Sequence, residues 1–250
     1  MKKLLAILLS LLLLLTACTP RPQPITPPEP QPPVTEVTPD PEPDPEPEPL
    51  GYTVGETTKN AQYDGLHVNI TLPVLTGKNQ AALDVINHYY ELLAGKVLDY
   101  AEGDLVAAPG VSYEVHAGYQ LTHASENTVS LLWQVTTVTT AESPAELTQS
   151  AAVFDVKTGN LCTFSDIFGE NAADARAWFV EHLRSTIPEM AENSYFYDQW
   201  YDLVETSFDP DSVHFDAAGV NVFYTQDALG SAVIAAMPYD AAAQFLAIAP

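Results

Sequence analysis

The sequence predicts an α+β fold of antiparallel sheets with packed helices, preceded by a signal peptide and a disordered proline-rich linker. Three observations support this class. Apolar and polar residues alternate strictly over residues 111–122, which is typical of a strand with one buried face. Apolar residues recur at steps of three and four over residues 79–100 and form one face of a helix. The composition changes abruptly at Gly51, where a proline-rich stretch gives way to frequent Val, Leu, Tyr and Phe.

Residues 1–17 have the pattern of a secretory signal. Two lysines precede an apolar run over residues 4–15, which is shorter than the roughly 20 residues of a membrane-spanning helix. The run ends in Leu15-Thr16-Ala17-Cys18, which resembles the lipobox of bacterial lipoproteins. This resemblance implies cleavage after residue 17, acylation of Cys18 and attachment of the mature chain to the lipid bilayer. The alternative is an ordinary signal cleaved near Ala17 and an incidental cysteine.

Residues 18–50 form a predicted tether. Residues 19–50 hold 14 of the 21 prolines, and alternating X-Pro sequence favours polyproline II over helix or sheet. Seven acidic residues against the single Arg21 add self-repulsion. At ~3.1 Å per residue, this segment reaches roughly 100 Å, which suits a spacer across a cell wall. A docking motif for a proline-reading domain is the alternative.

The body is expected to contain an N-terminal α+β subdomain over residues 51–157 and a C-terminal one over residues 158–250. In the first, we expect a helix packed on a sheet. Its predicted strands are 52–58, 66–72, 111–122, 128–139 and 149–156, its helix is 79–100, and turns lie at 63–65 and 157–160.

The C-terminal subdomain is predicted from shorter patterns. Pro188 is expected to end a helix that begins at residue 172. The strand over residues 232–237 is apolar on both faces, so we expect it at the centre of its sheet. The other predicted elements are an aromatic-rich segment at 194–204, strands at 213–215 and 220–224, and a terminal helix at 240–246.

Charge limits the classes of partner. The body carries 6 basic and 26 acidic residues, which excludes a nucleic-acid binder with a basic surface. Two cysteines in the chain exclude a disulfide scaffold. The negative field favours encounter with a cationic partner. Acidity that serves only solubility is the alternative interpretation.

The sequence contains no Gly-x-Ser-x-Gly, His-Glu-x-x-His, Walker or Gly-x-Gly-x-x-Gly motif. We therefore predict no catalytic residue, no metal and no cofactor. His116 and His123 are expected to be surface or hydrogen-bonded histidines. The alternative is that they bind a metal near a strand end. The acidic stretch 209–216 lacks the spacing of a calcium-binding EF-hand loop, which favours a solvated turn. Cys162 is expected to be a small buried apolar residue.

One dense aromatic group lies at residues 195–201. Exposed, its rings would stack on sugars or anchor a protein partner. In a helix, Phe196, Trp200 and Leu203 would share a face and enter the core. The candidate ligand-binding residues are Tyr195, Tyr197, Trp200 and Tyr201.

Several segments resemble a known domain pair. They are 158–168 (Thr-Gly-Asn-Leu-Cys-Thr-Phe-Ser-Asp-Ile-Phe), 220–224 (Val-Asn-Val-Phe-Tyr), Gly230, 235–239 (Ala-Ala-Met-Pro-Tyr), Phe245-Leu246 and the strand-and-helix region 63–100. Together, over residues 52–248, they are similar to the extracellular domains shared by RsiV-type anti-sigma factors, PdaC-type peptidoglycan deacetylases and related bacterial lipoproteins. The tyrosine-containing link of that family is altered at residues 225–229.

The resemblance implies a sensor or binding module, which in RsiV-type proteins binds lysozyme. We expect neither anti-sigma nor deacetylase activity, because the sigma-binding segment, the membrane-spanning helix and the metal-dependent catalytic domain have no counterpart in the sequence. The leading hypothesis is a non-enzymatic, membrane-anchored lipoprotein on the extracytoplasmic face, on a Gram-positive cell surface, that binds a cationic protein such as lysozyme. A peptidoglycan- or glycan-binding module and an unrecognised cell-envelope hydrolase are the alternatives.

Overall fold

A computed structural model describes residues 50–105, 110–139 and 145–250 of the chain. The predicted signal peptide, Cys18 and nearly all of the tether lie outside the described residues. Residues 48–250 form one compact unit. No helix among the described residues is long and apolar enough to cross a membrane.

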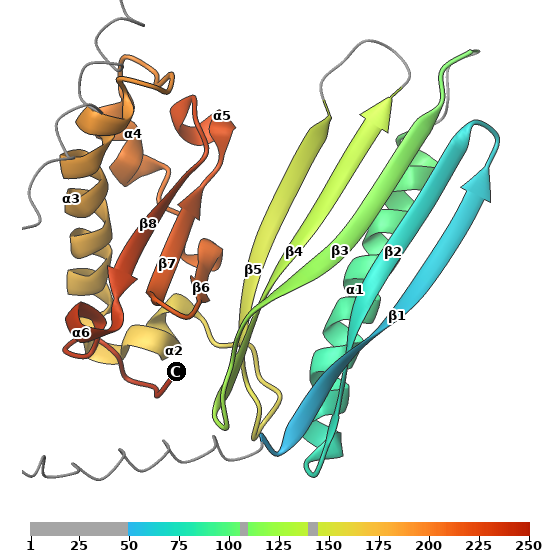
Figure 1. Ribbon diagram of the computed structural model, residues 1–250, viewed down its shortest axis with the longest axis horizontal. Helices are drawn as coiled ribbons and strands as arrows, with labels where there is room; N and C mark the ends of the chain where they lie inside the picture. The colour runs from blue at the N-terminus through green and yellow to red at the C-terminus, as the bar shows by residue number, and fades with distance from the viewer. Residues whose placement is uncertain (1–49, 106–109, 140–144) are drawn as a thin grey trace, which may run out of the picture. The chain divides into compact units, whose positions relative to one another are not determined.

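A five-stranded sheet forms the N-terminal half (Figure 1). Its strands follow one another in chain order, each beside its sequence neighbour. All neighbours are antiparallel except β2 and β3, which are parallel. The predicted α+β class with packed helices is therefore confirmed, and the sheet is mixed. The helix α1, Gln80–Gly103, connects these two strands, and such a crossover returns the chain in its original direction. The strands are β1 Tyr52–Tyr63, β2 Leu66–Gly77, β3 Tyr113–Ala124, β4 Thr128–Thr139 and β5 Glu146–Asp155.

The predicted helix face packs on this sheet. Ile86 and Tyr90 of α1 are fully buried, and the Tyr90 ring lies 5.9 Å from Trp133 of β4 and 6.1 Å from Phe154 of β5. Side chains of this size each contribute roughly 1.5–3 kcal/mol on burial. The α1 face of the sheet is therefore one apolar core, built from alternate residues of the strands.

The alternation in β3 is interrupted near its end. A register shift between Leu121 and His123 leaves Leu121 40% exposed and places His123 opposite Ser130. The His123 ring then lies 5.8 Å from Phe215, in the second half of the chain. The bulge thus redirects one side chain toward the contact between the two halves.

A second, three-stranded sheet has the order β6-β7-β8. The prediction that residues 232–237 form a central strand was wrong, because β7 is central and β8 is an edge strand with Ile234 54% exposed. Alanine supplies part of the apolar pattern on the outer face of β8, and apolar residues commonly remain exposed at a surface. These strands are β6 Val213–Phe215, β7 Gly219–Tyr224 and β8 Val233–Pro238.

The helix α3, Ala172–Met190, continues past Pro188, contrary to the prediction. Proline removes one backbone donor, but in the last turn little helix remains to be disturbed, and Ala191 N still donates to Ile187 O over 2.8 Å. Shorter helices complete the second core: α2 Phe164–Phe168, α4 Trp200–Thr206, α5 Gln226–Leu229 and α6 Tyr239–Ala242, with 3-10 turns at Gly169–Asn171 and Pro210–Ser212.

Two of the short helices begin with recognisable capping features. A capping box begins α2, in which the Thr163 hydroxyl accepts from Asp166 N and the Asp166 carboxylate accepts from Thr163 N. Pro238 precedes α6, where its missing donor costs nothing. The terminal helix is shorter than predicted, since α6 ends at Ala242.

The two halves meet through a buried polar contact that is surrounded by apolar residues. Ser130 of β4 is fully buried, and its hydroxyl accepts from Phe215 N over 3.0 Å and from the Thr122 hydroxyl over 3.0 Å. Val153 of β5 packs in the second core. These contacts hold β6 against β3, β4 and β5.

Candidate functional site

The predicted aromatic residues divide between surface and core. Tyr195 is 69% exposed and Tyr201 52% exposed, whereas Tyr197 and Trp200 are half-buried. Phe196 is buried but precedes α4, so it does not share a helix face with Trp200 as the sequence suggested. Exposure thus differs within this segment, since Tyr195 and Tyr201 lie at the surface and Phe196 lies in the core.

The structure places these aromatic residues in two ring pairs. The Tyr195 and Tyr197 centroids lie 5.9 Å apart with nearly perpendicular planes, and Trp200 and Tyr201 lie 5.6 Å apart. Tyr197 N donates to Leu229 O over 3.0 Å, and a Cβ on Gly230 would lie 3.2 Å from the Tyr195 ring. The first pair is thus held against the α5 end by close backbone contact.

Arg184 of α3 supports the second pair. Its guanidinium lies 4.4 Å from the Tyr201 ring centroid, within the range of a cation–π contact. It also donates to Glu181 over 2.8 Å and to Glu205 over 3.0 Å, which raises the pKa of Arg184. Its positive charge is therefore shared between two carboxylates and one ring, and the surrounding surface stays acidic.

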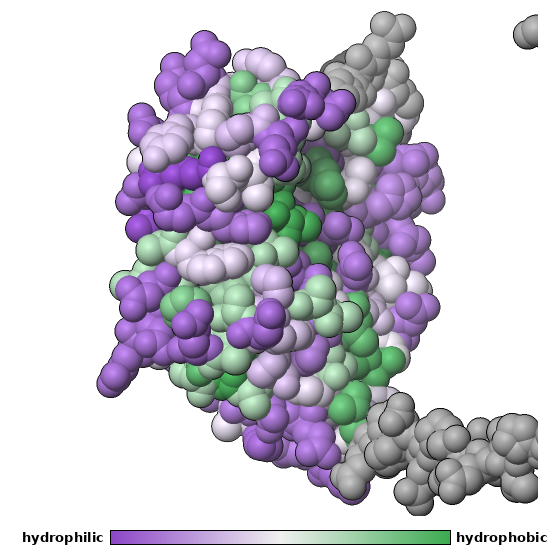
Figure 2. Space-filling view, turned by 60° about the vertical axis from the view of Figure 1, so that its left-hand side comes forward, coloured by the Kyte–Doolittle hydropathy of each residue, from purple (hydrophilic) through white to green (hydrophobic). Residues whose placement is uncertain are grey.

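We name residues 189–205 the acidic aromatic segment. Besides its two exposed tyrosines, it carries five exposed acidic residues: Glu189, Glu192, Asp198, Asp202 and Glu205. On the side turned forward in Figure 2, which carries α3, hydrophilic residues alternate with exposed apolar ones. Rings among carboxylates suit contact with a cationic, partly apolar partner surface.

Two cavities lie in the N-terminal half. The larger, about 350 Å³, is a groove between α1 and the β4–β5 side of the sheet. The smaller, about 230 Å³, lies where β1 begins and α1 begins. The groove is lined by Leu93, Lys96, Val97 and Tyr100 of α1, Trp133, Val135 and Thr137 of β4, and Glu146 and Thr148 of β5.

The basic residues of the body follow a simple division. Lys59, Arg176 and Arg184 form ion pairs with glutamates. Lys78, Lys96 and Lys157 form none with the described residues, and all three line the two cavities. Nothing in the local pattern around Lys78 or Lys157 indicates that both lysines line the same cavity.

Comparison with known proteins concerns the fold. No family model and no curated protein matches the chain. Several chains of solved structures do, among them two DUF3298 family proteins. That of Bacteroides fragilis has a TM-score of 0.52 at 14% identity and covers 80% of this chain and 94% of its own. That of Pseudomonas aeruginosa has a TM-score of 0.50 at 14% identity and covers 80% of this chain and 95% of its own.

The body thus shares its fold with DUF3298 family proteins of bacteria. The resemblance to the extracellular domains of RsiV-type and PdaC-type proteins stays a prediction.

The candidate metal ligands of the sequence do not converge. Exposed His116 lies 3.5 Å from Glu114, whereas His123 packs on Phe215. No group of three metal-binding side chains occurs among the residues that the structure describes. In the acidic stretch, the Asp209 carboxylate accepts from Asp211 N over 2.9 Å, so it caps a turn.

Cys162 is half-buried and packs at the rim of the second core, so it is more accessible than predicted. Burial, with the neighbouring Asp155 and Asp166 carboxylates, raises the pKa of the thiol. Its sulfur lies 4.0 Å from Asn160 O. A raised pKa disfavours the thiolate that a nucleophile needs.

Proposed function

We propose that this protein is a membrane-anchored, extracytoplasmic lipoprotein that binds a cationic protein, such as a lysozyme-like enzyme, and catalyses no reaction of its own. One observation carries the proposal. All described Asp and Glu residues are exposed except the half-buried Asp155 and Asp216, while half of the basic residues are engaged with glutamates. Such a surface attracts cationic proteins over long range.

The acidic aromatic segment is the contact that we propose for this partner. Tyr195 and Tyr201 supply exposed rings, and Arg184 and Glu205 hold Tyr201 in place. Aromatic residues commonly dominate interface energies, while surrounding charges set the rate of encounter. The partner would present lysine or arginine side chains to both the carboxylates and the rings.

The proposed location outside the membrane rests on the lipobox-like sequence before Cys18. Acylation there would hold the body outside the membrane on the proline-rich tether. The shared fold with bacterial DUF3298 family proteins is compatible with an extracellular domain.

The test uses the full chain in uncharged detergent with hen-type lysozyme as the cationic probe. We expect binding at 20 mM salt that weakens at least tenfold at 200 mM, because the attraction is screened. Tyr201→Ala and Asp202→Asn are each expected to weaken it at least threefold. Asp99→Asn, an exposed acid on α1, is the matched control and should change affinity less than twofold.

Absence of binding at low salt would contradict the proposal. Equal losses for Asp202→Asn and Asp99→Asn would place the contact elsewhere and remove the acidic aromatic segment from it. Circular dichroism of each variant checks that the fold is kept.

A second candidate is binding of peptidoglycan glycan strands, favoured by the 69% exposure of the Tyr195 ring beside Tyr197. Rings of this kind stack on sugars without involving charge. Co-sedimentation with purified peptidoglycan would then persist at 200 mM salt and be lost in Tyr195→Ala. Loss of co-sedimentation with salt would favour the cationic protein instead.

A further inference from the structure

The larger cavity is an open groove at one end of the five-stranded sheet. On the α1 face of β5, Phe154 is 2% exposed, whereas Thr148 and Glu146 near the start of the strand are exposed. The helix α1 runs behind β2 and β3 and leaves the start of β5 uncovered (Figure 1). A volume of about 350 Å³ remains between the helix and this part of the sheet, which is within the range of small-molecule sites.

The sheet wall of the groove has an apolar end and a polar end. Trp133 of β4 lines the apolar end and is 5% exposed. Further along β4, Val135 pairs with Thr148 of β5. Thr137 then pairs with Glu146 at the polar end. The lining therefore changes from an aromatic ring to hydroxyl and carboxylate groups over about 13 Å of strand.

The helix wall follows the same order. Because α1 runs opposite to β3, and β3 is antiparallel to β4, α1 and β4 run in the same direction. The Tyr90 ring lies 5.9 Å from Trp133 and fixes the apolar end. Tyr100 lies about 15 Å further along the helix, which places it at the polar end. Leu93 and Val97, which is 6% exposed, line the groove between them.

The lining carries one charge of each sign. Lys96 and Glu146 are its charged residues, and neither forms an ion pair with a described residue. An anion would meet Glu146 and the acidic field of the body, and a cation would meet Lys96 beside the apolar wall. The groove therefore favours a ligand without charge.

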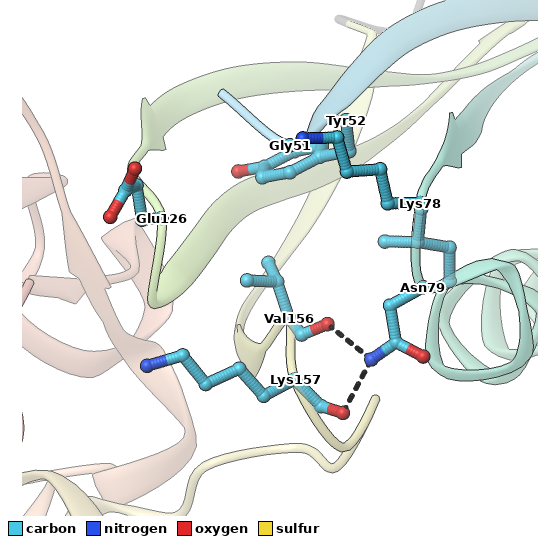
Figure 3. Close-up of a pocket in the computed structure, with 8 residues that line it drawn as sticks. Gly51, Tyr52, Lys78, Asn79, Glu126, Val156 and Lys157 are labelled. Carbon is cyan, nitrogen blue, oxygen red and sulfur yellow. Dashed lines mark hydrogen bonds between the residues drawn. The ribbon is translucent and has the colours of Figure 1, made fainter. Parts of the chain in front are cut away.

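The smaller cavity differs, because its charged groups do not meet. The side chains of Lys78 and Lys157 point in different directions (Figure 3). The Asn79 amide donates to Lys157 O over 2.6 Å. A Cβ on Gly159 would lie 2.3 Å from Ala82 O, so the turn after β5 is clamped to the first turn of α1. This cavity thus joins two segments of the fold, and the groove is the better candidate for a ligand.

We propose that the groove binds an uncharged amphiphile with a single apolar chain and a hydroxylated head. The chain lies on Trp133, Val97 and Leu93. The head meets the hydroxyl groups of Thr137 and Thr148, which can each donate and accept and so bind an alcohol without requiring charge. This site is separate from the acidic aromatic segment and does not depend on the proposed function.

The test is fluorine NMR of the full chain, labelled with 5-fluorotryptophan and reconstituted in phospholipid nanodiscs without detergent. The chain has three tryptophans, so Trp178 and Trp200 report on the rest of the body. Titration with 1-octanoylglycerol is expected to shift the Trp133 resonance until it saturates and to leave the other two unchanged. Octanoate and octylammonium, which carry a charge on an eight-carbon chain, should bind at least fivefold more weakly.

Three variants make the test specific. Thr148→Phe is expected to fill the groove from an exposed position of β5 and to weaken binding at least tenfold. Gln149→Phe is the matched control, since adjacent residues of a strand point to opposite faces, and should change affinity less than twofold. Lys96→Gln leaves Glu146 as the charged residue of the lining and should strengthen binding of octylammonium at least threefold.

Several results would overturn the proposal. An unchanged Trp133 resonance, equal shifts of all three tryptophans or equal losses in the two phenylalanine variants would remove the site. Tighter binding of octanoate or octylammonium than of 1-octanoylglycerol to the natural chain would show that the ligand is charged.

Discussion

Two glycines show how differently single positions constrain this fold. Gly159 has φ of +78°, and a Cβ there would lie 2.3 Å from Ala82 O, whereas a Cβ on the helical Gly95 would meet open space. Gly159→Ala is expected to destabilise the protein by at least about 2 kcal/mol, since it adds both backbone strain and a clash. Gly95→Ala should stabilise it by about 0.5–1 kcal/mol through helix propensity.

Urea unfolding followed by circular dichroism measures both free energies of unfolding. A Gly159→Ala variant as stable as the natural chain would mean that the turn of residues 157–160 is not clamped to α1. The cavity beside it would then lose its structural basis.

Protonation of the single residue His214 makes the free energy of unfolding depend on pH. Its side chain in β6 is buried, with the ring near Phe223, and burial lowers the pKa of the imidazole below its usual value. The unfolded chain therefore takes up the proton first as the pH falls, so the contribution of His214 is complete above about pH 6.5 and is lost below it.

We expect the free energy of unfolding of His214→Gln to fall less than that of the natural chain between pH 7 and pH 5. Urea titrations at both pH values give the two differences, and their comparison removes the pH effect of the many carboxylates. His123→Gln should act in the same direction, since burial also lowers the pKa of His123. Identical pH dependence in all three proteins would contradict the assignment.

At the scale of elements, β8 shows that a strand of apolar residues can be buried on one face only. Ile234 and Met237 lie on opposite faces of this strand, 54% and 0% exposed. Ile234→Thr is expected to change stability by less than about 0.5 kcal/mol, because little apolar area is lost. Met237→Ala should cost about 2–5 kcal/mol, because it leaves a cavity in the second core.

Thermal or urea unfolding of the two variants distinguishes a strand with one buried face from a strand that is buried on both faces. If Ile234→Thr were as destabilising as Met237→Ala, both faces of β8 would have to be covered, as the sequence pattern had suggested.

Elements with long, regular patterns were predicted best. The strand over residues 128–139 was predicted at its observed bounds, and the helix over residues 79–100 is α1, Gln80–Gly103. Features that depend on which strands lie side by side were predicted worst. The parallel pairing of β2 and β3 and the edge position of β8 depend on which strands meet in the sheet, and that information is not local.

At the scale of the whole molecule, the proposed anchor can be separated from the fold. In bacterial cells, the natural chain is expected to partition into the detergent phase, and Cys18→Ser into the aqueous phase, because the acyl chains supply the membrane affinity. Detergent phase separation followed by immunoblotting measures this. Cys162→Ser is the matched control and should remain in the detergent phase, and an unchanged distribution of Cys18→Ser would contradict lipidation.

The sequence alone determined the α+β class, the acidic character of the body and the secretory pattern at its start, because these depend on composition and on short-range periodicity. Only the tertiary structure decided which aromatic side chains reach the surface and that Lys78 and Lys157 share a cavity. The physical reason is that burial and convergence depend on contacts between segments far apart in the chain. Asn79 and Gly159 create one such contact, and no spacing within either segment encodes it.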